Sequence, residues 1–201
     1  MAFILTYRPL FELICIYSIL AFSQYVALRA GLFSLATAGF ASIGGYAGAI
    51  LLKETALGPV LSGIGAIICG IVAGLILSLP LARLRGAFQS IATIGFVQIM
   101  VSLTLYAQPL TGGPLGLNAI PKVATTAVLV PVVIVLAVLL AIINRSGIGR
   151  AFDAIRQDYT VAMSLGISVS RYFRYAFALS GAIGALGGCL LAYHTYSIQP
   201  D

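Results

Sequence analysis

The sequence predicts an all-α integral membrane protein: a polytopic bundle of about six transmembrane helices, some broken or re-entrant, with a charged cytoplasmic loop. The first observation is composition, since 61% of the 201 residues are hydrophobic, 8% are charged and the mean hydropathy is +1.09. So few polar residues cannot cover a soluble domain. The second is that the apolar residues form stretches of about 20, the length that a helix needs to cross a hydrocarbon core of roughly 30 Å. Helices are expected because backbone groups in lipid must be paired within their own segment.

In chain order, the apolar stretches are residues 10–28, 32–52, 57–81, 88–106, 123–143 and 172–192. The first could be taken for a signal peptide, but Glu12 interrupts it and the next stretch follows within a few residues. We therefore expect a retained helix. The second contains the run GLFSLATAGFASIGGYAG, residues 31–48, which is richer in Gly, Ser and Thr than packing requires. This run indicates an interrupted or closely packed helix that borders a cavity.

The basic residues predict the orientation. If the stretches alternate in direction, one side of the membrane receives Arg29, Arg83, Arg85, Arg145, Arg150, Arg156, Arg171 and Arg174, and the other receives Arg8, Lys53 and Lys122. Cytoplasmic loops carry the excess of Lys and Arg, so the first side is predicted to be cytoplasmic. The N-terminus and the TGGPLGLNAIPK loop would then lie outside. The net charge of +6 does not indicate nucleic-acid binding, because the basic residues are dispersed between apolar runs.

Residues 149–172 gather charges of both signs in a chain that has few of them. Placed on a helix, Phe152, Ile155, Tyr159, Met163 and Gly166 share one face, which predicts an amphipathic helix of about four turns. Gly166 is placed to end it, and Ser168 or Ser170 to cap the next helix.

Two interpretations of this amphipathic helix remain open. It could lie at the membrane interface with its aromatic residues in lipid, or it could dock into a groove on a cytoplasmic partner. Asp153 and Asp158 favour the partner, because acidic groups gain nothing from an anionic lipid surface.

Four stretches together resemble branched-chain amino acid ABC importer permeases of the LivM and LivH type. They are YSILAFSQYVALRAGLFSLATAGFASIGGYAG, LARLRGAFQSIATIGF, TGGPLGLNAIP and GRAFDAIRQDYTVAMSLGISVSRYFRYAFALSGAIGALGG. The resemblance spans nearly the whole chain, and the four matches occur in the family's order. It implies that 1–201 form a single transmembrane permease domain, in which 144–171 are a cytoplasmic coupling loop. Family members continue beyond the point where SIQPD ends this chain, so the domain is expected to be incomplete.

The resemblance also implies an ATP-driven importer of branched-chain or related small amino acids in the bacterial inner membrane. This chain would be no enzyme and would hold no cofactor or metal, because ATP and Mg²⁺ would bind partner subunits; the sequence has no GxxxxGK[ST] motif. The expected partners are two ATP-binding cassette subunits, a second homologous permease subunit, a periplasmic substrate-binding protein and the lipid bilayer.

Candidate site residues follow from the resemblance and from the Gly-rich run. The residues expected to couple to the ATPase are Gly149, Arg150, Phe152, Ala154, Ile155, Arg156, Asp158, Leu165 and Gly166. The residues expected along the substrate pathway are Ser34, Thr37, Ser42, Gly44 and Gly45.

Some positions depart from the family pattern and leave alternatives open. Asp153 stands where a basic residue is common, Tyr159 where an acidic one is common, and Thr37 where a His is usual. A permease for urea or short amides is therefore an alternative. A passive channel and an intramembrane enzyme are alternatives of another class, although the sequence has no acidic residue at the centre of an apolar stretch and only one His.

Overall fold

The computed structural model describes residues 2–54, 58–84, 86–118 and 120–199. Its long helices are α1 (Ala2–Arg29), α2 (Thr37–Glu54), α3 (Pro59–Leu81), α4 (Ala87–Tyr106), α6 (Thr126–Arg145) and α9 (Val169–Thr195). The shorter elements are α5 (Gln108–Thr111), the 3-10 helix η1 (Gly113–Leu115), α7 (Gly147–Gln157), α8 (Tyr159–Ser164) and the antiparallel strands β1 (Leu117–Asn118) and β2 (Ser197–Ile198). The predicted all-α architecture is confirmed.

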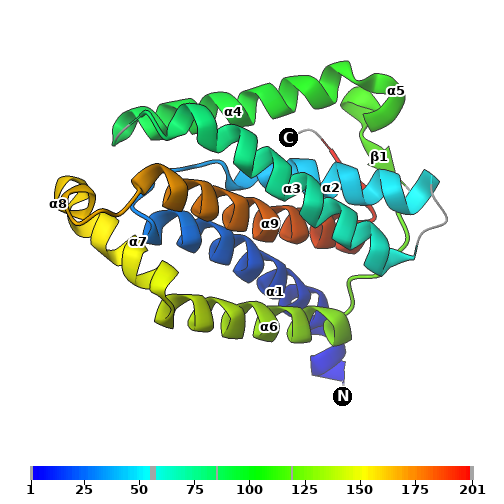
Figure 1. Ribbon diagram of the computed structural model, residues 1–201. Helices are drawn as coiled ribbons and strands as arrows, with labels where there is room; N and C mark the ends of the chain where they lie inside the picture. The colour runs from blue at the N-terminus through cyan, green and yellow to red at the C-terminus, as the bar shows by residue number, and fades with distance from the viewer. Residues whose placement is uncertain (1, 55–57, 85, 119, 200–201) are drawn as a thin grey trace.

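The long helices run back and forth between the two ends of one bundle (Figure 1). The end of the bundle that carries α7 and α8 also holds the last residues of α1, α3 and α6 and the first residues of α4 and α9. The opposite end holds α5, β1 and β2. The elements that carry Arg29, Arg83, Arg145, Arg150, Arg156, Arg171 and Arg174 therefore meet at one end, as alternation requires. Arg85, one of the basic residues predicted on this side, and Leu57, the first residue of the predicted stretch 57–81, lie outside the described residues.

Among the described residues, five helices are long and apolar enough to cross a membrane: Tyr7–Arg29, Pro59–Leu81, Ala87–Tyr106, Thr126–Arg145 and Val169–Thr195. The sequence predicted about six. The missing one is α2, whose glycines and charged C-terminal end lower its hydropathy. It packs against both α3 and α9, so most of its surface contacts protein and needs no apolar side chains for lipid.

The predicted interruption after α1 is confirmed. Arg29 ends α1, Gly31 adopts a left-handed conformation with φ of 78°, and residues 32–36 have no helical structure. Neighbouring helices satisfy this backbone: Gln24 of α1 donates to the Ser34 carbonyl at 2.6 Å, and Ser90 of α4 donates to the Phe33 carbonyl at 2.9 Å. Non-helical backbone can thus persist at membrane depth because protein surrounds it.

Helix α9 is the centre of the bundle and contacts α1, α2 and α3 (Figure 1). Close approach depends on glycines, the packing device expected where lipid removes the hydrophobic drive between helices. A Cβ atom at Gly44 of α2 would overlap the backbone of Ala185 in α9, and one at Gly74 of α3 would overlap that of Phe177. These glycines therefore pack the helices backbone to backbone.

Candidate functional site

The charged loop folds as two helices, and the prediction of one continuous helix of four turns is wrong. Helix α7 ends at Gln157, and Asp158 begins α8 by accepting hydrogen bonds from the backbone amides of Thr160 at 2.7 Å and Val161 at 3.1 Å. An Asp side chain that caps a helix start competes with the helical path of its own backbone. Beyond α8, Gly166 adopts a φ of 80° and ends the helix as predicted.

The apolar face of α7 is buried inside this chain, which corrects the prediction that it docks into a partner. Phe152 and Ile155 are only 2% and 5% exposed and pack with residues of α1, α3 and α9 in one core cluster. The Phe152 ring meets the ring of Tyr172 edge to face. Phe152 and Ile155 thus anchor the loop to the membrane bundle. The surface available to a partner is formed by other residues of the loop.

A polar network also fastens α7 to α1. Arg29 at the end of α1 donates from Nη2 to Asp153 Oδ2 at 2.8 Å and from Nη1 to the Tyr25 hydroxyl at 2.9 Å. Asn144 at the end of α6 donates to the same hydroxyl at 3.0 Å. The ends of three elements are thereby tied together beside the loop. The sequence showed these charges but gave no sign that Asp153 and Arg29 are partners.

The outward surface of the loop is formed by other residues. Arg150, Arg156, Asp158, Leu165 and Gly166 are exposed, whereas Ala154 is half-buried and Gly149 is buried. Gly149 packs so closely that an added Cβ would meet the carbonyl oxygens at the end of α6. Helix α8 adds two exposed apolar side chains, Val161 and Met163. We call Val161, Met163 and Leu165, with Arg150 and Arg156, the outer loop surface. Val161 was not predicted as part of it, because the prediction assumed an unbroken helix.

The residues proposed for the substrate pathway separate into two groups. Gly44 and Gly45 lie in helix contacts, against Ala185 and Ile198 respectively. Ser34 and Thr37 hold the interrupted backbone, and the Thr37 hydroxyl donates to Gln24 Oε1 at 2.8 Å. None of these four lines the cavity between α2, α4 and α9, whereas Ser42 does.

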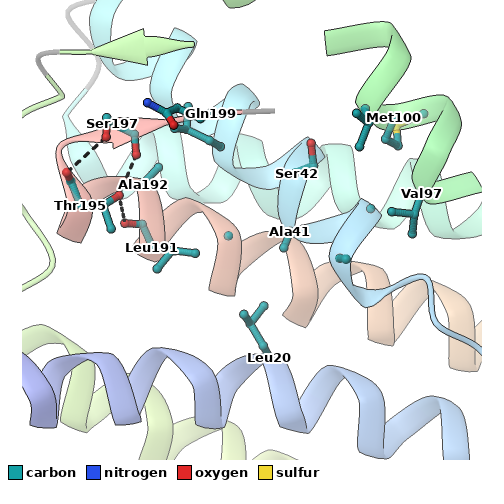
Figure 2. Close-up of a pocket in the computed structure, with 15 residues that line it drawn as sticks. Leu20, Ala41, Ser42, Val97, Met100, Leu191, Ala192, Thr195, Ser197 and Gln199 are labelled. Atoms are coloured by element: carbon teal, nitrogen blue, oxygen red, sulfur yellow. Dashed lines mark hydrogen bonds between the residues drawn. The ribbon is translucent and has the colours of Figure 1, made fainter. Parts of the chain in front are cut away.

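This cavity has a volume of about 470 Å³ and lies between α2, α4, α9 and the β2 segment. Figure 2 shows Ser42 of α2 projecting between Met100 of α4 and Gln199 beyond β2. The lower side is apolar and includes Leu20 of α1 and Leu191 of α9. The predicted cavity beside the Gly-rich run is therefore present, bordered by the first turns of α2.

Nothing in the described part of the chain resembles a metal centre, because no three His, Cys, Asp or Glu side chains gather there. Among the described residues, the strongly buried carboxylate is that of Glu12, which is 1% exposed and accepts hydrogen bonds from the Thr126 backbone amide at 3.0 Å and hydroxyl at 2.7 Å. Arg8 and Lys122 lie beside it. The group ties α1 to the first turn of α6 and has the form of a structural ion cluster.

Comparison with known proteins identifies the family of this chain. A profile of the family described as "Branched-chain amino acid transport system / permease component" matches residues 10–201. The chain belongs to this permease family. It is 31% identical over 226 residues to the high-affinity branched-chain amino acid transport system permease protein LivM of Salmonella typhimurium, a match that covers 92% of the chain and 52% of that protein. LivM of Escherichia coli matches with the same identity and coverage.

The chain thus spans about half the length of the permeases it matches. The resemblance inferred from four sequence stretches is confirmed, and with it a multi-pass membrane protein of a transport family. No solved structure matches the chain with comparable significance.

Proposed function

We propose that this chain is a transmembrane subunit of an ATP-driven importer that carries branched-chain or related small amino acids across the bacterial inner membrane. ATP would be hydrolysed by two ATP-binding cassette subunits at the end of the bundle that carries α7 and α8. A second homologous permease subunit and a periplasmic binding protein would complete the transporter. Membership of the permease family supports this proposal.

The observation that carries the proposal is the outer loop surface. Leu165 is 72% exposed and Val161 53% exposed, at the end of the bundle where the basic residues gather. Burying one such side chain contributes roughly 1.5–3 kcal/mol to binding, whereas an exposed ion pair at Arg150 or Arg156 contributes about 0–1 kcal/mol. A groove on a soluble partner that accepts α8 would therefore be held mainly by these apolar residues.

The mechanism follows from how the loop is fastened. When two ATPases close around ATP, they displace the elements docked on them. Because Phe152 and Ile155 are buried against the bundle and Asp153 is bound to Arg29, α7 transmits that displacement to α1 and α9 without slipping. The spans then reorient and expose the pathway to the other side of the membrane, a rigid-body change of the kind used for alternating access.

The test is purification of the complex from detergent after co-expression with the candidate ATPase subunits. Leu165→Asp should remove most of the ATPase from the complex at an unchanged permease level. Leu115→Asp is the matched control, since Leu115 is 77% exposed at the opposite end of the bundle, and it should retain the full complement. Equal ATPase content in both variants would contradict the docking role of α8, and a wild-type complex that imports no leucine would contradict the proposed function.

A further inference from the structure

We propose that the cavity between α2, α4 and α9 binds the transported solute, with Ser42 and Gln199 available to its polar groups and the α4 residues in contact with its side chain. The inference rests on the proposed function and assigns its binding site. With a volume of about 470 Å³, the cavity falls within the range of small-molecule pockets, which are mainly apolar with a few polar groups that fix orientation.

The charge of the lining limits what the cavity accepts. Its described lining residues include no Asp, Glu, Lys, Arg or His. A solute with a net charge would move from water into a cavity that offers no counter-charge. An unpaired charge in such a low-dielectric site is costly. A zwitterion has no net charge, and hydroxyl, amide and carbonyl groups can satisfy its two ends. The lining therefore selects neutral over cationic or anionic amino acids.

Two polar side chains of the lining are available to a solute. Neither Ser42 nor Gln199 forms a side-chain hydrogen bond with any residue that the structure describes. Thr195 is already engaged, since its hydroxyl lies 2.9 Å from the Leu191 carbonyl oxygen and 2.7 Å from that of Ser197. The Ser42 hydroxyl and the Gln199 amide are thus available to the ammonium and carboxylate groups of an amino acid (Figure 2).

The apolar lining comes from three helices. Val97, Met100 and Val101 belong to α4, and Leu20 and Leu191 add apolar surface from α1 and α9. Branched aliphatic side chains fit such a surface, and the unbranched Met100 can adjust to differences of one methylene group. Of the pathway residues predicted from the sequence, Ser42 lines this cavity, whereas the lining residues of α4 were not predicted.

Ligand protection of single cysteines tests the binding site. In a full-length chain with Cys15, Cys69 and Cys189 replaced, Ser42→Cys and Val97→Cys are labelled with N-ethylmaleimide, with and without leucine. At a leucine concentration of about ten times its Kd, labelling of both cysteines should slow by about tenfold. Ile94→Cys is the control: Ile94 is exposed on α4 and is not in the cavity lining, so leucine should not protect it. Lysine should protect none of the three.

Transport provides the second measurement. Met100→Trp should fill the cavity and abolish leucine uptake by the assembled importer, whereas Ile94→Trp, which lies outside the lining, should retain it. If leucine does not slow the labelling of Ser42→Cys and Val97→Cys in an importer that transports leucine, the cavity is not the binding site. Normal leucine uptake by Met100→Trp would overturn the assignment as well. Failure of the wild-type complex to import leucine would instead count against the proposed function, and protection, which needs no transport, would still decide the site.

Discussion

Arg29 and Asp153 come from distant parts of the chain, and their ion pair joins the end of α1 to α7. Their side chains are 21% and 45% exposed, so solvent screens the pair and its coupling energy should be about 0.2–1 kcal/mol. Arg29→Ala, Asp153→Ala and the double variant, compared by thermal unfolding in detergent, should show that coupling. Strict additivity of the two single changes would mean that the pair does not stabilise the loop.

Glu12 makes a second residue-scale prediction, because its carboxylate satisfies the start of α6. Glu12→Leu leaves the Thr126 amide without its acceptor and should lower the unfolding free energy by about 1–3 kcal/mol. Glu12→Gln keeps an oxygen at that position and should cost less. The measurement is the unfolding midpoint of both variants, and an equal loss would show that charge, not the acceptor, matters.

Residue-scale features were predictable where one local rule decides them. Gly166 ends α8 and Ser168 precedes α9, as residue type suggested, although the Ser168 side chain makes no capping bond. Partnerships between distant residues, such as Arg29 with Asp153, were not predictable, because they depend on how α1 and α7 meet.

At the scale of the elements, backbone-to-backbone packing makes α2 and α9 intolerant of added atoms. Gly44→Ala would place a methyl group on the Ala185 backbone and should reduce the yield of folded protein. Gly63→Ala in α3 is the matched control, since a Cβ there meets nothing within 4 Å, and better helix propensity should stabilise it by up to about 1 kcal/mol. Folded yield after size-exclusion chromatography measures both. Similar behaviour of the two variants would contradict the packing role.

The periodic pattern failed where it met a competing local signal. It placed Phe152, Ile155, Tyr159 and Met163 on one face. This is correct for Phe152 and Ile155, which lie in α7, but Asp158 starts a new helix and turns Met163 outward. Amphipathicity also could not tell whether the apolar face meets this chain or a partner. That distinction comes from tertiary packing, which buries Phe152 and Ile155 inside the bundle.

For the whole molecule, the alternation of six apolar stretches gave the arrangement of the bundle, including α2. Hydropathy alone would have omitted α2, because a helix surrounded by protein does not need an apolar surface. The sequence could not locate the cavity, since its lining comes from four separate stretches of the chain.

The orientation of the bundle in the membrane is the remaining prediction at this scale. The basic residues that gather beside α7 and α8 should keep that end in the cytoplasm, because cytoplasmic loops retain Lys and Arg. Leu115 and Leu165 are 77% and 72% exposed at opposite ends of the bundle. Cysteines placed there are therefore equally accessible to a reagent on their own side of the membrane. In a cysteine-free background expressed without ATPase partners, an impermeant maleimide should label Leu115→Cys in intact spheroplasts. It should label Leu165→Cys only after the membrane is permeabilised. Labelling of Leu165→Cys from outside, with Leu115→Cys protected, would reverse the orientation and remove α8 from the reach of any cytoplasmic ATPase.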